Sequence, residues 1–288
     1  MTGEPRSVWS LGAQLGEGPL WIEGALWFVD IKSRQVHRFD PATDKRQSWT
    51  APEQVGFIVP RASGGMIVGL QSGLWSFDPT TGAFGPIVEV DAHLPNNRLN
   101  DAVVDAHGRL WFGTMHDGET DPTGSFYCYA EGKLSATGLE GISITNGPAI
   151  APDGRTLYWV DTLGGTVSAA AIEADGRIGE SRLFAQILPA EGYPDGPTVD
   201  ADGCVWIGLY AGWEARRYSP AGELIERVRF PVANITKVAF DGADGGTLFA
   251  TTARQLLDED QLRLQPQAGD LFAAPTSIKG LPCFAVRD

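Results

Sequence analysis

The feature that most constrains this 288-residue chain is a pattern that recurs six times: a glycine-containing turn followed by a short apolar strand. The apolar runs are centred at positions 27, 67, 111, 158, 206 and 249, a spacing of 40 to 48 residues. A second strand-like run follows each one, as in QVHRFD and GLWSFD, and weaker runs bring each unit to about four strands. Short strands repeated at this period are typical of a β-propeller.

The repeat therefore predicts an all-β fold, a six-bladed β-propeller of four-stranded blades that occupies residues 1–288 as a single domain. Two stacked sandwiches would not explain a regular period. Helical periodicity is nearly absent, and segment 254–264 is the only candidate for a short helix. Because an open sheet edge attracts other chains, the ring has to close, and either segment 7–11 or segment 281–286 can supply the closing strand.

Composition and charge exclude several kinds of partner. The formal net charge of -14 disfavours binding to nucleic acid and to anionic membranes. No run approaches the roughly 20 apolar residues of a membrane-spanning helix, and the first residues lack a basic-then-apolar signal pattern. The 3 cysteines lie far apart, which favours reduced thiols over a disulfide framework. We expect a cytoplasmic protein that acts on a small molecule and has no obligate protein partner.

One position at the start of each inner strand comes into register when the six units are aligned on the turn that ends that strand. The innermost strand of each propeller blade lines the central channel, so side chains at this position are expected to face one common space. The six residues are Glu17, Gly56, Asn100, Asn146, Asp195 and Thr236. Four of them carry carboxylate or carboxamide oxygens.

Each of these residues also has a simpler structural interpretation. Taken alone, the Asn-Gly pair at 146–147 and the Asp-Gly pair at 195–196 are typical of tight turns. However, separate turn pairs that end in glycine occur at positions 24, 108, 154, 203 and 245. Unrelated turn residues need not share one register, and clustered carboxylates repel one another unless a cation lies between them. The register therefore favours an oxygen-rich site for a hard divalent cation.

Four segments carry a resemblance to a known family. They read LGEGPLW at 15–21, NRLNDAVVDAHGRLWFGTM at 97–115, ITNGPAIAPDGRTLYWVDT at 144–162 and YPDGPTVDADGCVWIG at 193–208. In this order they resemble the SMP-30/gluconolactonase/luciferin-regenerating-enzyme-like family, and the resemblance covers nearly the whole chain. It implies a six-bladed propeller that holds one catalytic divalent metal ion and hydrolyses lactones.

The resemblance also implies roles for individual residues. Glu17, Asn146 and Asp195 match the family's metal ligands. Arg98 and Asn100 match its substrate-binding pair. The metal stays open among Ca, Mg, Mn, Fe(II) and Zn. Members hydrolyse aldonolactones, the cyclic esters that sugar dehydrogenases form, so the nearest type is a bacterial gluconolactonase or xylonolactonase of oxidative sugar catabolism.

The sequence departs from the family in one loop. Some members have an acidic residue soon after the Gly-Thr-Met segment, and this residue touches the substrate. Here the loop reads HDGE at 116–119, so either Asp117 or Glu119 can occupy the position. The ambiguity leaves the choice between five- and six-carbon lactones open.

The matched residues support a hydrolytic mechanism. A divalent cation polarises a lactone carbonyl and lowers the pKa of a bound water. Asp195 is expected to hold the metal and to accept a proton from the attacking water as general base. Arg98 is expected to bind ring hydroxyls or to stabilise developing negative charge. The aromatic residues considered as pocket walls are Tyr193, Tyr210, Trp213 and Phe57.

Two other functions stay open. A hydrolase of the same architecture can act on phosphotriesters or aryl esters, which require apolar pocket walls, whereas a sugar lactone requires polar groups. A non-enzymatic binding propeller is the third alternative, and metal content of the purified protein separates it from the first two. A serine hydrolase is unsupported because the sequence contains no G-x-S-x-G elbow, and its 4 histidines lack zinc-ligand spacing.

Overall fold

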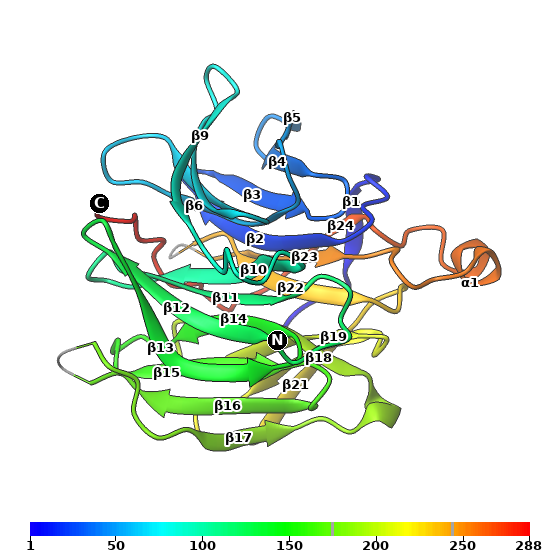
Figure 1. The fold of residues 1–288 in the computed structure, drawn as a ribbon. Helices are drawn as coiled ribbons and strands as arrows, with labels where there is room; N and C mark the ends of the chain where they lie inside the picture. Colours follow the sequence, from blue (N-terminus) through cyan, green and yellow to red (C-terminus); the bar gives the residue numbers. More distant parts are fainter. Residues whose placement is uncertain (174–175, 243–244) are drawn as a thin grey trace.

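The computed structural model describes residues 1–173, 176–242 and 245–288. Almost all regular structure in these residues is β-strand, arranged in sheets around a central axis (Figure 1). The expected all-β propeller fold is therefore confirmed. The short helix α1 (Glu259–Leu264) projects from the body of the molecule, and the 3-10 turn η1 (Pro189–Glu191) precedes a central strand.

Four sheets each contain four consecutive strands, which run in order from the channel outward. The first contains β2 (Gly16–Ile22), β3 (Ala25–Asp30), β4 (Gln35–Asp40) and β5 (Lys45–Thr50). The second contains β6 (Val55–Pro60), β7 (Met66–Leu70), β8 (Gly73–Asp78) and β9 (Ala83–Glu89). The third contains β10 (Asn97–Val104), β11 (Leu110–His116), β12 (Gly124–Ala130) and β13 (Lys133–Ile142). The fourth contains β14 (Thr145–Ile150), β15 (Thr156–Asp161), β16 (Thr166–Ala171) and β17 (Arg182–Gln186).

The remaining eight strands form one continuous sheet. Its order is β1 (Arg6–Trp9), β24 (Leu271–Pro275), β23 (Thr247–Thr252), β22 (Ile235–Phe240), β18 (Tyr193–Val199), β19 (Val205–Tyr210), β20 (Glu214–Tyr218) and β21 (Leu224–Arg229).

The prediction of six four-stranded blades is wrong, because the described chain forms four separate four-stranded blades and this eight-stranded sheet. The join is a parallel bridge between Gly196 of β18 and Lys237 of β22. A Cβ atom at Gly196 would lie 2.7 Å from the Lys237 side chain, so glycine is what lets the two strands approach. The repeat period records how often strands recur and contains no information about this pairing.

The inner strands β2, β6, β10, β14, β18 and β22 neighbour one another in this order around the axis, and β22 closes the ring against β2. The N-terminal segment supplies the outermost strand on the β22 side of the eight-stranded sheet, because β1 pairs antiparallel with β24. Segment 281–286 does not supply it: Gly280 and Val286 form only isolated bridges, to Asp200 and Arg61. The choice that the sequence left open is thereby decided in favour of the N-terminal segment.

The helix predicted at 254–264 is present only over α1, which begins after its N-cap Asp258. The preceding segment stays non-helical because Leu256 has a left-handed backbone, with φ of 63°. The Gln255 amide also donates to the Gln14 carbonyl at 2.9 Å, which ties it to the segment before β2 instead of to a helix. Tertiary contacts therefore shorten the helix.

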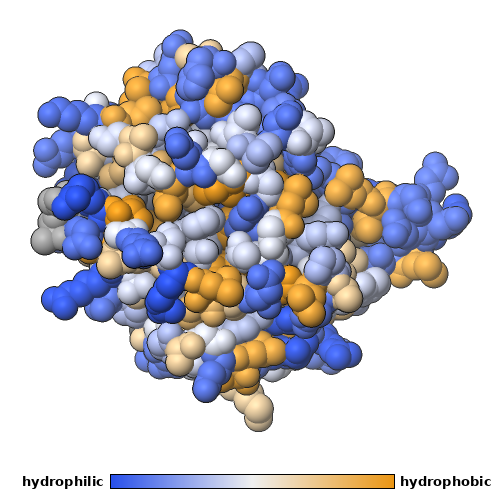
Figure 2. All heavy atoms as spheres, turned by 60° about the horizontal axis from the view of Figure 1, so that its bottom comes forward, coloured by the Kyte–Doolittle hydropathy of each residue, from blue (hydrophilic) through white to orange (hydrophobic). Residues whose placement is uncertain are grey.

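The hydrophobic core lies between neighbouring sheets. For example, Tyr158 and Val160 of β15 pack in one cluster with Ile207 and Leu209 of β19. Burying an aliphatic side chain of this size stabilises the fold by about 1.5–3 kcal/mol. Figure 2 shows that one face of the surface carries hydrophobic residues only in small groups scattered among hydrophilic ones. No helix in the described part of the chain is long and apolar enough to cross a bilayer.

Two turns between inner and second strands are fixed by the same buried arrangement. The carboxylate of Asp200 accepts hydrogen bonds from the amides of Asp202 and Cys204 at 3.0 Å and from Trp206 Nε1 at 2.9 Å. Arg217 Nε donates to its second oxygen at 2.7 Å. The same pattern is built around Asp105, whose partners are His107, Arg109 and Trp111. In both turns the acidic residue stands six positions before a buried tryptophan.

We expect Asp200→Ala to destabilise the protein by about 3 kcal/mol or more, because it leaves the buried Trp206 Nε1 and the Arg217 guanidinium without their acceptor. Asp202→Ala is the matched control, since Asp202 pairs with the same arginine at 2.8 Å but its side chain is 74% exposed. That exposed pair should contribute less than about 1 kcal/mol. Urea unfolding measures both, and similar midpoints for the two variants would contradict this account.

Candidate functional site

All six inner strands interrupt their pairing with the next strand at the same level. The irregularities lie at Glu17/Leu20, Val55/Phe57, Leu99/Ala102, Asn146/Ala149, Pro194/Pro197 and Ile235/Lys237. A bulge in a strand redirects a side chain and is frequent beside functional sites. The register seen in the sequence therefore marks the level at which the ring turns polar side chains inward.

The upstream ends of the inner strands open into a cavity of about 510 Å³. Its deep wall includes five of the residues predicted from the sequence, all of them buried: Glu17, Arg98, Asn100, Asn146 and Asp195. The structure thus brings them together from β2, β10, β14 and β18, which lie far apart in the sequence. The 195–196 pair lies inside β18 and not in a turn, whereas Gly203 has the left-handed backbone of a turn, with φ of 77°.

The two carboxylates of the site, Glu17 and Asp195, lie where their charged forms are disfavoured. Burial and the charge of Asp101 raise the pKa of Glu17 to about 7, although Lys237 and the Gly18 amide oppose the shift. Burial and the charge of Glu17 raise the pKa of Asp195 well above its usual range. The negative charge of Glu17 makes ionisation of Asp195 costly, and a cation between the two carboxylates would reduce that cost.

A chain of hydrogen bonds orients the carboxamides. Asn146 Nδ2 donates to Thr162 Oγ1 at 2.9 Å. The carboxamide oxygen of Asn146 therefore points away from Thr162. Asn100 Nδ2 donates to that oxygen at 3.1 Å and to the Thr145 carbonyl at 2.7 Å. The Asn100 oxygen in turn accepts from Arg98 Nη1 at 2.5 Å. Both donor hydrogens of Asn100 are therefore in use, and it offers a ligand only a lone pair on its oxygen.

The two acidic candidates of the 116–119 loop have different positions. Asp117 does not line the cavity; it accepts from Arg98 Nε at 2.8 Å, from Lys32 Nζ at 2.5 Å and from Gln54 Nε2 at 3.0 Å. Burial raises the pKa of Asp117, but these bonds and charges outweigh it and hold the pKa below its usual value. Glu119 lines the cavity. Asp117 thus holds Arg98 in place, whereas Glu119 faces the space available to a ligand.

Three of the four predicted aromatic residues, Tyr193, Tyr210 and Trp213, line the cavity. Phe57 does not: it is buried against Phe112 and lines a second cavity at the other end of the channel. The prediction for Phe57 is wrong because neighbouring residues of a strand point to opposite sides.

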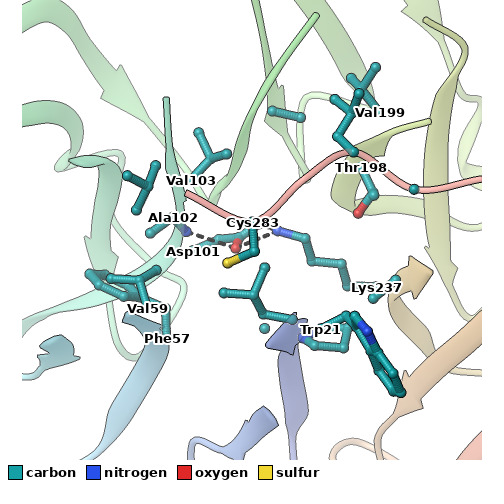
Figure 3. A pocket seen from close by; sticks show the side chains of 18 of the residues that line it. Trp21, Phe57, Val59, Asp101, Ala102, Val103, Thr198, Val199, Lys237 and Cys283 are labelled. Carbon is teal, nitrogen blue, oxygen red and sulfur yellow. Dashed lines mark hydrogen bonds and ion pairs between the residues drawn. The ribbon is translucent and has the colours of Figure 1, made fainter. Parts of the chain in front are cut away.

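The second cavity lies at the downstream ends of the inner strands, under the C-terminal segment (Figure 3). Lys237 Nζ donates to both oxygens of Asp101, at 2.6 and 2.7 Å, and the pair is buried. Asp101 also accepts from the Gly147 amide at 2.9 Å. This ion pair stands at the boundary between the two cavities, directly below the polar level.

Sequence reasoning missed Asp101, Lys237 and Thr162. A signal for the first two was present, because each stands one residue after a position in the shared register and their charges are opposite. No sequence pattern marks Thr162, whose hydroxyl meets Asn146 only in the folded chain.

The donor set fits a hard divalent cation. Glu17 and Asp195 supply carboxylate oxygens and Asn146 supplies a carboxamide oxygen, the donors that Ca²⁺ and similar ions prefer. Two buried carboxylates at raised pKa are also the environment that a cation relieves. Among the described residues, no group of three or more His, Cys, Asp and Glu side chains is placed to hold a metal. The proposed site does not meet this definition, because its donors are the two acids Glu17 and Asp195 and the amide Asn146.

Comparison with known proteins gives one family and several relatives. Residues 15–254 match the SMP-30/Gluconolactonase/LRE-like region. The chain is 35% identical to the L-arabinolactonase of Azospirillum brasilense over 273 residues, covering 93% of this chain and 90% of the relative. It is 32% identical to regucalcin of Xenopus laevis over 288 residues, covering 93% and 95%.

The fold has a close counterpart among solved structures. The calcium-binding protein regucalcin of Agrobacterium tumefaciens superimposes with a TM-score of 0.94 at 29% identity, covering 99% of this chain and 98% of that protein. The agreement extends over the whole ring of sheets and is not limited to the segments that carry the motifs.

In the absence of metal, we expect stability to fall as the pH rises from about 4.5 to 7. Over this range folded Glu17 keeps a proton that the unfolded chain has lost, since its ordinary pKa is 4.5 and its folded pKa is about 7. The loss should reach roughly 3 kcal/mol. Urea unfolding in chelator measures it as the difference between wild type and Glu17→Gln.

Subtracting the variant removes the titrations of groups that do not interact with Glu17, such as that of buried His37, whose pKa burial lowers to about 4. Adding a divalent cation at pH 8 should then stabilise wild type more than Glu17→Gln. If the two proteins show parallel stability curves from pH 4.5 to 8, Glu17 is not strained as described.

Proposed function

Because this chain belongs to the SMP-30/gluconolactonase/LRE-like family, we propose that it hydrolyses sugar lactones to their open acids with the help of one divalent cation. The observation that carries the proposal is the level at which all six inner strands break their pairing. There two strained carboxylates, two carboxamides and an arginine converge on a cavity large enough for a small ligand. Xylonolactone and gluconolactone are the first substrates to test.

We propose Glu17, Asn146 and Asp195 as the residues that hold the cation. When bound there, the cation supplies Lewis-acid polarisation of the lactone carbonyl and a water of lowered pKa. A relative described as a calcium-binding protein and the oxygen-only donors favour Ca²⁺, with Mg²⁺, Mn²⁺, Fe²⁺ and Zn²⁺ as alternatives. Thr162 and Asn100 would support the site by fixing the orientation of the Asn146 carboxamide.

The protein's own groups would then carry the proton and the charge. Asp195 accepts a proton from the attacking water, and its burial beside Glu17 supports this role by raising its pKa well above the usual range, which makes it a stronger base. Arg98 is fixed by Asp117 and Asn100, and its positive charge stabilises the oxyanion that forms on the carbonyl oxygen. When this intermediate collapses, the bond from the carbonyl carbon to the ring oxygen breaks, and the proton held by Asp195 passes to the ring oxygen. Glu119 accepts hydrogen bonds from substrate hydroxyls at the wall of the cavity.

A second candidate is hydrolysis of aryl esters or phosphotriesters at the same site. The aromatic side chains of Tyr210 and Trp213 beside the polar floor favour it, since these substrates need apolar walls. The deciding experiment is pH-stat hydrolysis of a panel of aldonolactones, an aryl ester and a phosphotriester, after chelation and re-addition of single metals. The cytoplasmic location expected from the sequence stays a prediction.

Asp195→Asn is the sharpest test of the mechanism. The carboxamide is nearly isosteric but cannot accept a proton from water, so we expect a folded protein whose kcat falls by about 100-fold or more with metal in excess. Asp202→Asn is the matched control, because Asp202 precedes a turn glycine in the same hairpin and is exposed. Near wild-type turnover by Asp195→Asn would remove Asp195 from the mechanism.

The two acids of the 116–119 loop should separate kinetically. Asp117→Asn takes the charged partner from Arg98, so kcat/KM should fall roughly 10- to 100-fold through a loss of oxyanion stabilisation, mainly in kcat. Glu119→Gln removes a substrate contact and should mainly raise KM, by several-fold. Steady-state kinetics on one aldonolactone distinguishes the two, and an interchange of the two effects would reverse the assigned roles.

A further inference from the structure

We infer that Leu163, Trp213 and Leu256 form an apolar subsite at the mouth of the cavity, which binds an apolar substituent on the lactone carbon that is bonded to the ring oxygen. The inference rests on the proposed lactonase function and extends it to the class of substrate. It starts from exposure: these three side chains are 50%, 45% and 75% exposed, and all three line the same cavity.

Single exposed hydrophobic residues are common and need no explanation, but several that converge on one cavity do. Here they come from three separate loops, which follow β15, β19 and β23. The floor of the same cavity is polar, so the mouth and the floor have opposite chemistry. A substrate that fits both has a polar reacting end and an apolar remote end.

The backbone conformation of the mouth supports a built site. Trp213 and Leu256 have left-handed backbones, with φ of 62° and 63°, and the neighbouring Ala211 has φ of 59°. This conformation is unfavourable for residues with a Cβ and persists only where the surroundings impose it. It turns the Trp213 and Leu256 side chains to the cavity, although solvent exposure is costly for both.

Hydrogen bonds make these loops rigid. The Trp213 amide donates to the Ala233 carbonyl at 3.0 Å. Asn234 joins the two loops, because its Oδ1 accepts from the Ala211 amide at 3.1 Å and its Nδ2 donates to the Gln255 carbonyl at 3.1 Å. The apolar side chains are thus held in place before a ligand arrives, which reduces the entropy that binding must overcome.

Several polar side chains at the mouth hold the loops, whereas the buried Gln255 Oε1 has no hydrogen-bond partner in the described part of the chain. Besides Asn234, Gln265 accepts from the Ala233 amide through Oε1 at 2.6 Å, and the Tyr210 hydroxyl donates to the Gln255 carbonyl. A ligand that reaches the mouth therefore meets mainly apolar surface. A lactone whose carbonyl lies at the floor can extend a chain on the carbon next to its ring oxygen toward this surface.

The test is a series of δ-lactones that carry hydrogen, methyl, propyl or pentyl on the ring carbon bonded to the ring oxygen. For wild type, kcat/KM should rise along the series, by up to about fourfold for each methylene that is buried. Trp213→Ser and Leu256→Ser should flatten the rise. Leu264→Ser is the matched control, since Leu264 is 83% exposed on α1 and does not line the cavity.

A flat or falling series in wild type would overturn the inference, as would an unchanged slope in both cavity variants. Failure of the proposed function is distinguished by measuring binding of 2-alkyltetrahydropyrans, which have the ring and the chain but no carbonyl. If no lactone is hydrolysed while these ethers still bind more tightly with chain length, and do so less in Trp213→Ser, the subsite stands and the lactonase function fails. If chain length does not affect ether binding either, both fail.

Discussion

The ion pair between Asp101 and Lys237 is the interaction on which the centre of the ring depends. Lys237 reaches from β22 across the channel to Asp101 on β10, and Asp101 binds the Gly147 amide of β14. The stem of Lys237 lies over Gly196 of β18, where no side chain can be accommodated. One pair therefore holds four inner strands together. Removing two charges from water is costly, and this cost is offset here because both oxygens of Asp101 accept from Lys237 and each also accepts from a backbone amide. The pair also acts electrostatically on Glu17 one level above, because the charge of Asp101 raises the pKa of Glu17 and the charge of Lys237 partly offsets that rise.

The polar level above this pair combines constraints that conflict in the absence of a cation. Bulges in all six inner strands redirect side chains into a narrow space, and closure of the ring keeps water from solvating them. Glu17 and Asp195 then repel each other, and one positive charge at Lys237 is already bound to Asp101. The fold, stabilised by apolar contacts between neighbouring sheets, is able to support this strain. The ring therefore holds two carboxylates close together without supplying a free positive charge from its own inner strands to neutralise them.

Much of this arrangement could be predicted from the sequence, because repeats make equivalent positions visible. The 40–48-residue period predicted the propeller fold, and alignment of the units placed Glu17, Asn100, Asn146 and Asp195 at one level. Period alone could not reveal that β18 and β22 pair, since that depends on the close approach of Gly196 and Lys237. Nor could the period distinguish the roles of Asp117 and Glu119. In the folded loop the first side chain contacts Arg98, whereas the second lines the cavity. Phe57 was misplaced although strand alternation, applied to its neighbour Gly56, would have placed it on the other side.

The floor and the mouth of the cavity are built by different parts of the chain. Apart from the two acids of the 116–119 loop, the groups proposed for catalysis lie on the inner strands of the ring. Displacement of one inner strand would disturb its neighbours. The mouth is formed by loops, two of which are joined by Asn234. Loops of this kind can change in sequence while the scaffold stays constant. In this architecture the proposed chemistry is therefore tied to the stability of the fold, whereas the choice of substrate depends on a few side chains, such as Trp213, that the fold does not require.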